Sequence, residues 1–137
     1  PKQRPEMAIH KFARAITDGD SIPFFGDGSS RRDYTYVDDI VAGVRAAMER
    51  QDSYAIFNLG GAATTSLSDL VAQLAAALGK PAILEKLPDQ PGDVLITYAD
   101  VSLAERELGY CCTTPLADGV KKFCAWYVKE KSAGRLP

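Results

Sequence analysis

The sequence predicts an α/β fold, in which amphipathic helices alternate with short apolar strands. Three observations support this fold class: apolar residues recur at helical spacing in several long segments, short apolar runs lie between them, and Gly or Pro stands at most boundaries. The chain has 137 residues, of which 46% are hydrophobic and 25% charged. This size is typical of one domain with a core of its own, and we treat residues 1–137 as one unit.

The first elements are a helix, a strand and a glycine turn. Residues 6–17 have helical periodicity and stop at Gly19, with His10 on the polar side, where we expect it to face solvent. Pro23-Phe24-Phe25 is typical of a short aromatic strand that begins with proline. Gly26-Asp27-Gly28 then supplies the conformational freedom that a tight turn requires.

A charged elbow, residues 31–39, leads from this turn into a second helix over 37–49. Its acidic first turn suits the positive end of the helix dipole. Arg31 and Arg32 precede it, and a planar guanidinium matches phosphate oxygens, so the pair could hold a phosphorylated ligand. The simpler alternative is a solvated charge cluster, because charged runs mostly face water.

Residues 54–59, Tyr-Ala-Ile-Phe-Asn-Leu, predict a strand that is apolar on both faces. Such a strand is typical of the interior of a parallel sheet and needs neighbours on both sides. The remaining elements each have a recognisable start or stop: a helix from Ser66 (with Asp69 as a capping-box variant) to Gly79, a strand over 81–87, a polar loop over 88–93, a short helix from Asp100 to Gly109, and a last helix from Thr114-Pro115.

Composition argues against several classes of partner. The formal net charge of -2 gives no basic footprint for nucleic acid. No apolar run has membrane-spanning length and the start has no signal-peptide core, so we expect a cytoplasmic protein without a membrane partner. Three cysteines are present, and the adjacent Cys111-Cys112 pair lacks zinc-ligand spacing, so we expect reduced thiols and no metal site.

Three polar loops are candidates for a common site: Gln3-Arg4-Pro5, Gly26 to Asp33, and Gln90 to Asp93. If they meet, they offer cations for phosphates, a carboxylate for sugar hydroxyls and an aromatic strand for a base. This is the outline of a nucleotide-sugar site, which composition alone does not establish.

Five stretches carry a resemblance that covers nearly the whole chain. They are Pro-Lys-Gln-Arg-Pro-Glu-Met-Ala (1–8), Phe-Gly-Asp-Gly-Ser-Ser-Arg-Arg-Asp-Tyr-Thr-Tyr-Val-Asp-Asp-Ile (25–40), Phe-Asn-Leu-Gly-Gly (57–61), Gln-Pro-Gly-Asp-Val (90–94), and Leu-Gly-Tyr with Thr-Pro-Leu (108–116). In order and spacing they resemble the carboxyl-terminal part of the extended short-chain dehydrogenase/reductase family, the NAD-dependent epimerases and dehydratases. Within it, they are most similar to UDP-glucuronate 4-epimerases.

The resemblance implies a small substrate-binding domain, with strand 54–59 belonging to the parallel Rossmann sheet of the intact enzyme. The chain starts without Met, so we expect an excerpt whose NAD-binding Rossmann part lies outside residues 1–137. An intact member would be a homodimer that uses NAD, and we expect none to bind this piece alone.

The resemblance also implies roles for nine residues that contact a UDP-sugar, UDP-glucuronate or UDP-galacturonate. Pro23, Phe24 and Phe25 would lie along the uracil, and Arg32 would hold the diphosphate. Asn58 would lie near the nucleotide, and Gln90 and Asp93 would line the ribose and phosphate. Arg4 would reach the sugar carboxylate, and Lys11 is the ninth residue of the set. Asp33, Tyr34 and Asp38 would brace the elbow without touching ligand. No residue is assigned to catalysis, cofactor or metal.

The family's reaction oxidises the sugar at C4 with NAD, turns the keto sugar over and reduces it again. It needs a cofactor glycine loop and a Tyr-x-x-x-Lys pair. Gly26-x-Gly28 lacks the third glycine, and Tyr127-x-x-x-Lys131 has a spacing that arises on any helix. We therefore expect this piece to be inactive alone.

Two alternatives remain open at this level. One is another UDP- or dTDP-sugar epimerase, dehydratase or decarboxylase of the same family. The other is a non-catalytic binding or interaction module, in which strand 54–59 and the helix before it expose apolar surface and cause self-association or strand exchange.

Overall fold

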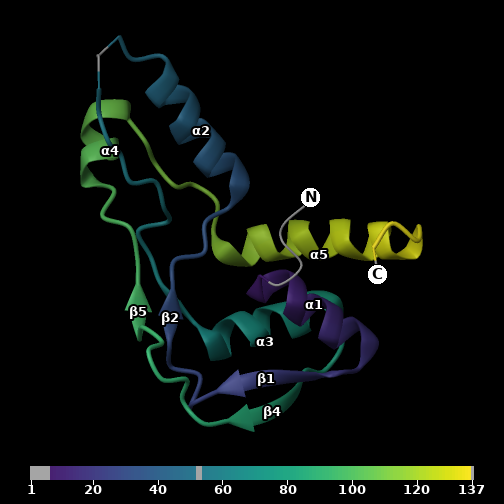
Figure 1. Cartoon of the computed structure of the whole chain (residues 1–137). Helices are drawn as coiled ribbons and strands as arrows, with labels where there is room; N and C mark the ends of the chain where they lie inside the picture. Colours follow the sequence, from purple (N-terminus) through teal and green to yellow (C-terminus); the bar gives the residue numbers. More distant parts are fainter. Residues whose placement is uncertain (1–6, 52–53, 137) are drawn as a thin grey trace.

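The computed structural model describes residues 7–51 and 54–136. Its elements, in chain order, are α1 (Ala8–Asp18), β1 (Ser21–Phe25), β2 (Arg31–Arg32), α2 (Val37–Met48), β3 (Thr65–Ser66), α3 (Leu67–Leu78), β4 (Ile83–Leu87), β5 (Ile96–Thr97), α4 (Ser102–Leu108) and α5 (Leu116–Ser132). Figure 1 shows a lower body, in which α5 lies above α1 and α3 with β1 and β4 below, and an upper arm that carries α2 and α4. The vertical strands β2 and β5 connect the two parts.

Two small sheets confirm the predicted α/β class. β1 and β4 pair in parallel, and β2 pairs antiparallel with β3 and parallel with β5. β1 begins at Ser21, earlier than predicted, so Pro23 stands in the middle of the strand opposite Glu85. An edge strand of a two-stranded sheet tolerates proline there, because only one of its sides needs ladder hydrogen bonds.

The main core lies between the β1–β4 sheet and the helices α1, α3 and α5. Its buried apolar members, which exclude water together, are Phe12, Ile16, Ile22, Phe24, Leu70, Val71, Leu74, Val120 and Cys124. Ile22 and Phe24 come from β1, and the other seven come from the periodic positions that the sequence predicts for these helices. This packing fixes α1 against β1, and both elements contribute to the site described below.

The predicted helix ends are confirmed where their signals are local. The Ser66 hydroxyl accepts a hydrogen bond from the Asp69 N–H at 3.0 Å, and α3 stops at Gly79 in the left-handed conformation. The start of α4 differs slightly from the prediction. Val101 occupies the capping position, while the Asp100 carboxylate accepts from the Ser102 N–H at 3.0 Å and still satisfies the open helix end.

A second, smaller cluster of buried residues, Val101, Ala104 and Tyr110, holds the upper arm together. The Tyr110 hydroxyl donates to the Gly60 carbonyl at 2.8 Å. Gly43 lets α2 approach this cluster, because a Cβ at that position would lie 2.7 Å from a methyl of Leu59.

Residues 54–59 form no strand in the described part of the chain, in contrast to the prediction for this segment. Tyr54 is 80% exposed and Ile56 69%, and no neighbouring strand among the described residues pairs with them. The apolar face of α2 is similarly uncovered, with Val41 49% and Met48 78% exposed. Backbone hydrogen bonds of a strand require a partner, which explains why an apolar run alone does not become one.

His10 is buried, and the prediction of a surface histidine is wrong. Its ring packs edge-on against Tyr127 with centroids 5.4 Å apart, and Phe123 and Trp126 also adjoin it. Burial lowers the pKa of His10, and the nearby charge of Arg14 lowers it further. The periodicity of α1 could not show this contact, because α5 supplies it from the far end of the chain.

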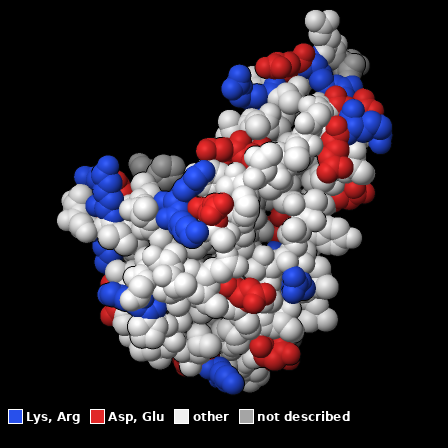
Figure 2. Space-filling model, turned by 180° about the vertical axis from the view of Figure 1, so that it is seen from behind, with Lys and Arg blue, Asp and Glu red and all other residues white. Residues whose placement is uncertain are grey.

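None of the described helices has both the length and the apolar character needed to cross a bilayer. Figure 2 shows Lys and Arg interspersed with Asp and Glu over the face opposite to that of Figure 1. On that face no large area carries charge of one sign only.

Candidate functional site

A cavity of about 270 Å³ opens where α1, β1, β2 and α3 meet, and we call it the arginine cavity. Five of the nine predicted contact residues line it: Lys11, Pro23, Phe25, Arg32 and Asp93. They come from α1, β1, β2 and the loop after β4, so the fold brings together positions that are distant in the sequence. The remaining lining residues are Ala8, Phe12, Ser30, Tyr34 and Leu67.

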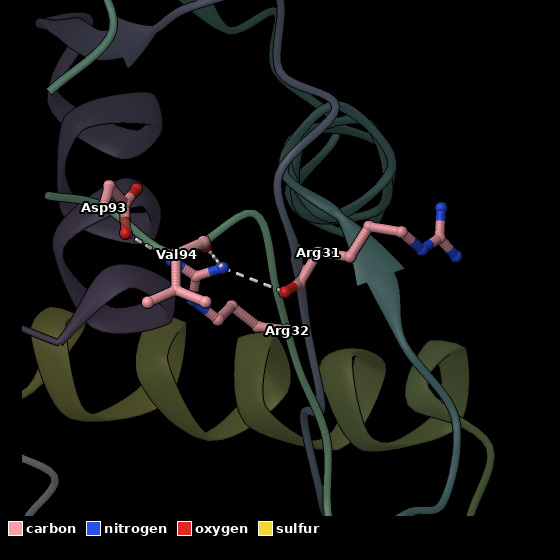
Figure 3. A network of polar contacts seen from close by, with 4 residues as sticks. All are labelled: Arg31, Arg32, Asp93 and Val94. Atoms are coloured by element: carbon pink, nitrogen blue, oxygen red, sulfur yellow. Dashed lines mark hydrogen bonds and ion pairs between the residues drawn. The ribbon is translucent and has the colours of Figure 1, made fainter. Parts of the chain in front are cut away.

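Alternation along the extended chain decides which residues of the elbow face the arginine cavity. Ser30, Arg32 and Tyr34 line it, as expected for positions two apart. Arg31 turns to the other side, where it donates to the Thr64 hydroxyl at 2.8 Å and to the Thr64 carbonyl at 2.5 Å. Figure 3 shows the two guanidinium groups pointing apart. The arginines therefore do not act as a pair: one faces the cavity and the other fixes a loop.

The Arg32 guanidinium is held by three acceptors (Figure 3). One terminal nitrogen donates to the Val94 carbonyl at 2.6 Å and to the Arg31 carbonyl at 2.9 Å, and the other donates to the Asp93 carboxylate at 2.5 Å. The Arg32 side chain is 29% exposed and that of Asp93 47%. The guanidinium is thus positioned by the backbone but remains open to the cavity.

Alternation also separates the three residues predicted to lie along a base. Pro23 and Phe25 line the arginine cavity, whereas Phe24 points into the core and is 5% exposed. Phe24 belongs to the same buried cluster as Ile22. The aromatic surface available to a ligand is therefore that of alternate residues on β1.

Two other predicted residues, Gln90 and Asn58, line different cavities. Gln90 lines a smaller cavity of about 90 Å³ that shares Phe25, Ser30 and Asp93 with the arginine cavity. Asn58 lines a separate cavity of about 490 Å³, which we call the asparagine cavity, and donates to the Asp100 carbonyl at 3.3 Å. Arg4 lies outside the described residues.

Asp33 braces the elbow, as predicted. One carboxylate oxygen accepts from the Gly61 N–H at 2.8 Å and from the Thr35 hydroxyl at 3.1 Å, and the other accepts from the Ala99 N–H at 3.3 Å. Tyr34, which was also predicted to brace the elbow, lines the arginine cavity. Burial raises the pKa of Tyr34, and the charge of Arg32 partly offsets that rise.

Asp39 has a structural role that the sequence did not indicate. Its buried carboxylate accepts from the Thr113 N–H at 3.2 Å, the Thr113 hydroxyl at 3.0 Å and the Thr114 N–H at 3.1 Å. Burial alone would raise the pKa of Asp39, but these hydrogen bonds and one from Cys112 together lower it. No local signal marks this contact, since the donors precede α5.

Tyr127 and Lys131 both lie on α5, where a Tyr-x-x-x-Lys spacing places the two residues one turn apart. Tyr127 is fully buried in the body of the molecule, and Lys131 forms an ion pair with Asp18 at 2.5 Å. This pair joins α5 to the end of α1. Among residues 7–51 and 54–136, no three His, Cys, Asp or Glu side chains are grouped to hold a metal ion.

Comparison with known proteins identifies the relatives of this chain. Residues 1–60 match the model of the NAD dependent epimerase/dehydratase family. UDP-glucuronate 4-epimerase 4 of Arabidopsis thaliana is 39% identical over 98% of this chain and 35% of its own length. The dTDP-glucose 4,6-dehydratase of Streptomyces griseus is 36% identical over 100% of this chain and 44% of its own length.

The structure has solved relatives as well. UDP-glucuronic acid 4-epimerase from Bacillus cereus, solved in complex with UDP-glucuronic acid and NAD, superposes with a TM-score of 0.86 at 34% identity. The match covers 94% of this chain and 42% of that one. The chain thus spans less than half the length of each of these three relatives.

Proposed function

Because this chain belongs to the NAD-dependent epimerase/dehydratase family, we propose that it is the substrate-binding portion of a nucleotide-sugar epimerase. The single observation that carries the proposal is the arginine cavity, where two cations, an aromatic strand and a carboxylate meet. These are the groups that a nucleoside diphosphate requires. Similarity to UDP-glucuronate 4-epimerases along nearly the whole chain supports UDP-glucuronate as the substrate.

In this proposal, the arginine cavity receives the nucleoside diphosphate. Arg32 and Lys11 would hold the phosphate oxygens by charge-assisted hydrogen bonds. Pro23 and Phe25 would form the apolar surface beneath the base. At the ribose, Asp93 would accept hydrogen bonds and Gln90 could both accept and donate them. Arg4 would pair with the sugar carboxylate. Phe24 would support the site indirectly from the core, and Asn58 would do so from the asparagine cavity.

NAD in the intact enzyme would supply hydride transfer at the sugar's C4 carbon. We assign no residue of this chain to NAD, nor to the proton transfer at the reacting hydroxyl. The residues described here would bind and orient the nucleotide end of the substrate. The cofactor loop and the Tyr-x-x-x-Lys pair would lie in the part of the relatives' length that this chain does not cover, so the chain alone would be inactive.

Calorimetric titration with UDP tests the site. We expect weak binding that Arg32→Ala reduces by about tenfold or more, because a charge-assisted hydrogen bond to phosphate is lost. Arg45→Ala is the matched control, since Arg45 is an exposed arginine of α2 away from the arginine cavity. Binding that survives Arg32→Ala unchanged would remove Arg32 from the site and the proposal with it.

A second candidate, a sugar-nucleotide 4,6-dehydratase, is favoured by the similarity to the Streptomyces enzyme. Product analysis on a longer protein that contains this chain separates the two. Conversion of UDP-glucuronate to UDP-galacturonate supports the epimerase, whereas a 4-keto-6-deoxy sugar from a dTDP- or UDP-hexose supports the dehydratase.

A further inference from the structure

We propose that Asp93 determines specificity by keeping simple anions off Arg32 while admitting anions that also carry hydroxyl groups. This inference rests on the proposed function, since it concerns the same cavity, and it names how that cavity selects its ligand. The observation behind it is that Asp93 lines both the arginine cavity and the smaller cavity beside it.

An incoming anion meets charges of both signs in the arginine cavity. Two cations, Lys11 and Arg32, line the arginine cavity, but Asp93 forms an ion pair with Arg32 at 2.5 Å. An anion that approaches Arg32 must therefore displace the Asp93 carboxylate or accept its repulsion at close range. A ligand that has only anionic oxygens offers Asp93 no hydrogen-bond donor to replace the guanidinium.

A nucleoside diphosphate would place phosphate oxygens at Arg32 and ribose hydroxyls next to Asp93. A carboxylate only accepts hydrogen bonds, so ribose hydroxyls can donate to Asp93 when it leaves the guanidinium. The side chain of Asp93 is 47% exposed, which leaves it room for this exchange.

Arg32 has acceptors other than Asp93 that fix its position. The carbonyls of Arg31 and Val94 accept from the same terminal nitrogen of Arg32, and Asp93 accepts from the other. Two backbone acceptors would therefore still hold the guanidinium in place. Asp93 therefore offsets the positive charge of Arg32, whereas the backbone carbonyls fix the position of the guanidinium.

The test is a pair of titrations, with inorganic pyrophosphate and with UDP, on the wild-type chain and on Asp93→Asn. We expect pyrophosphate to bind the variant about two- to fivefold more tightly, the range of a partly exposed ion pair. We expect UDP to bind the variant about tenfold more weakly, because a hydrogen bond to a charged acceptor is lost. Opposite shifts for the two probes are the signature of the proposal.

Two further variants serve as controls. Asp118→Asn also removes one negative charge and breaks an exposed ion pair, the one with Lys121. Because Asp118 lies on α5, this variant should leave the affinities for pyrophosphate and UDP unchanged. Asp93→Glu keeps the charge and should retain wild-type affinity for pyrophosphate. Thermal unfolding would show whether Asp93→Asn folds, and Asp93→Glu keeps the proposal testable if it does not. Tighter binding of pyrophosphate by the Asp93→Glu variant overturns the proposal.

The outcomes separate this inference from the proposed function. No gain in pyrophosphate affinity on Asp93→Asn, including no detectable binding, overturns the role of Asp93 whatever UDP does. Shifts of both probes in the same direction also overturn it. A wild-type chain that binds no UDP contradicts the proposed function, while a gain for pyrophosphate would still support the exclusion of simple anions by Asp93.

Discussion

Asp33 and Asp39 both lie in the charged elbow, and their carboxylates accept hydrogen bonds from backbone N–H groups of distant segments. Asp33 joins the elbow to Gly61 and Ala99, and Asp39 joins α2 to Thr113 and Thr114. Neither carboxylate lines the arginine cavity. They position the segment that carries Arg32, so their substitution should affect stability before it affects ligand contacts.

Asp39→Asn tests this role through its dependence on pH. The pKa of Asp39 is lowered in the folded state, so its contribution to stability is present above the ordinary value of 3.8 and is lost as the pH falls below it. We expect the variant to lose about 1–3 kcal/mol near neutral pH, from hydrogen bonds to a buried acceptor. Urea denaturation should show this difference shrinking toward about pH 3. The exposed neighbour Asp38→Asn is the control, and a constant difference at all pH values would contradict the account.

Gly28 supports the site through close packing as well as through its backbone conformation. Its φ is +78°, and a Cβ there would fall on the Phe24 ring and the Ser68 hydroxyl. Gly19 has nearly the same φ, +80°, but no atom near its Cβ position. We expect Gly19→Ala to cost about 1–2 kcal/mol from backbone strain. Gly28→Ala should cost about 1–3 kcal/mol more, because it overpacks the core. Thermal unfolding of both variants measures the difference, and equal losses would rule out the packing role of Gly28.

At the scale of elements, sequence patterns predicted what depends on local signals. The helices and their ends were identified because apolar spacing, Ser66 and the glycine stops are all read within a few residues. Which face of an element is covered depends on distant partners. For this reason the sequence did not predict that Phe24 and Arg31 face away from the arginine cavity. Nor did it predict that Asn58 lines another cavity or that His10 packs against α5. The alternation Ser30, Arg32 and Tyr34 was visible in the sequence and could have added two residues to the site.

The apolar face of α2 gives a prediction about association. Val41 and Val44 are 49% and 45% exposed on the same helix, and exposed apolar surface of this kind promotes self-association. We expect the chain to sediment as a mixture of monomer and larger species at high concentration. Val41→Asp should shift this mixture toward monomer without lowering the unfolding temperature. A strictly monomeric wild-type chain would show that this face does not drive association.

At the scale of the whole molecule, the two parts of the structure carry different surfaces. The lower body has the main core and the arginine cavity, whereas the upper arm exposes the α2 face together with Tyr54 and Ile56. The chain spans only 35% and 44% of the length of two epimerase/dehydratase relatives. We propose that the remaining part of such a protein would cover the upper arm and would supply the sheet neighbours of residues 54–59. The sequence alone could not place that segment, because no strand among the described residues pairs with it.

The central claim is that a nucleoside diphosphate binds in the arginine cavity and not in the larger asparagine cavity. Nuclear magnetic resonance of the isotope-labelled chain during titration with UDP tests this most directly. We predict that shifts concentrate on Lys11, Phe25, Arg32 and Asp93, including the guanidinium N–H of Arg32. Shifts confined to Asn58, Tyr98 and Asp100, which line the other cavity, would contradict the account.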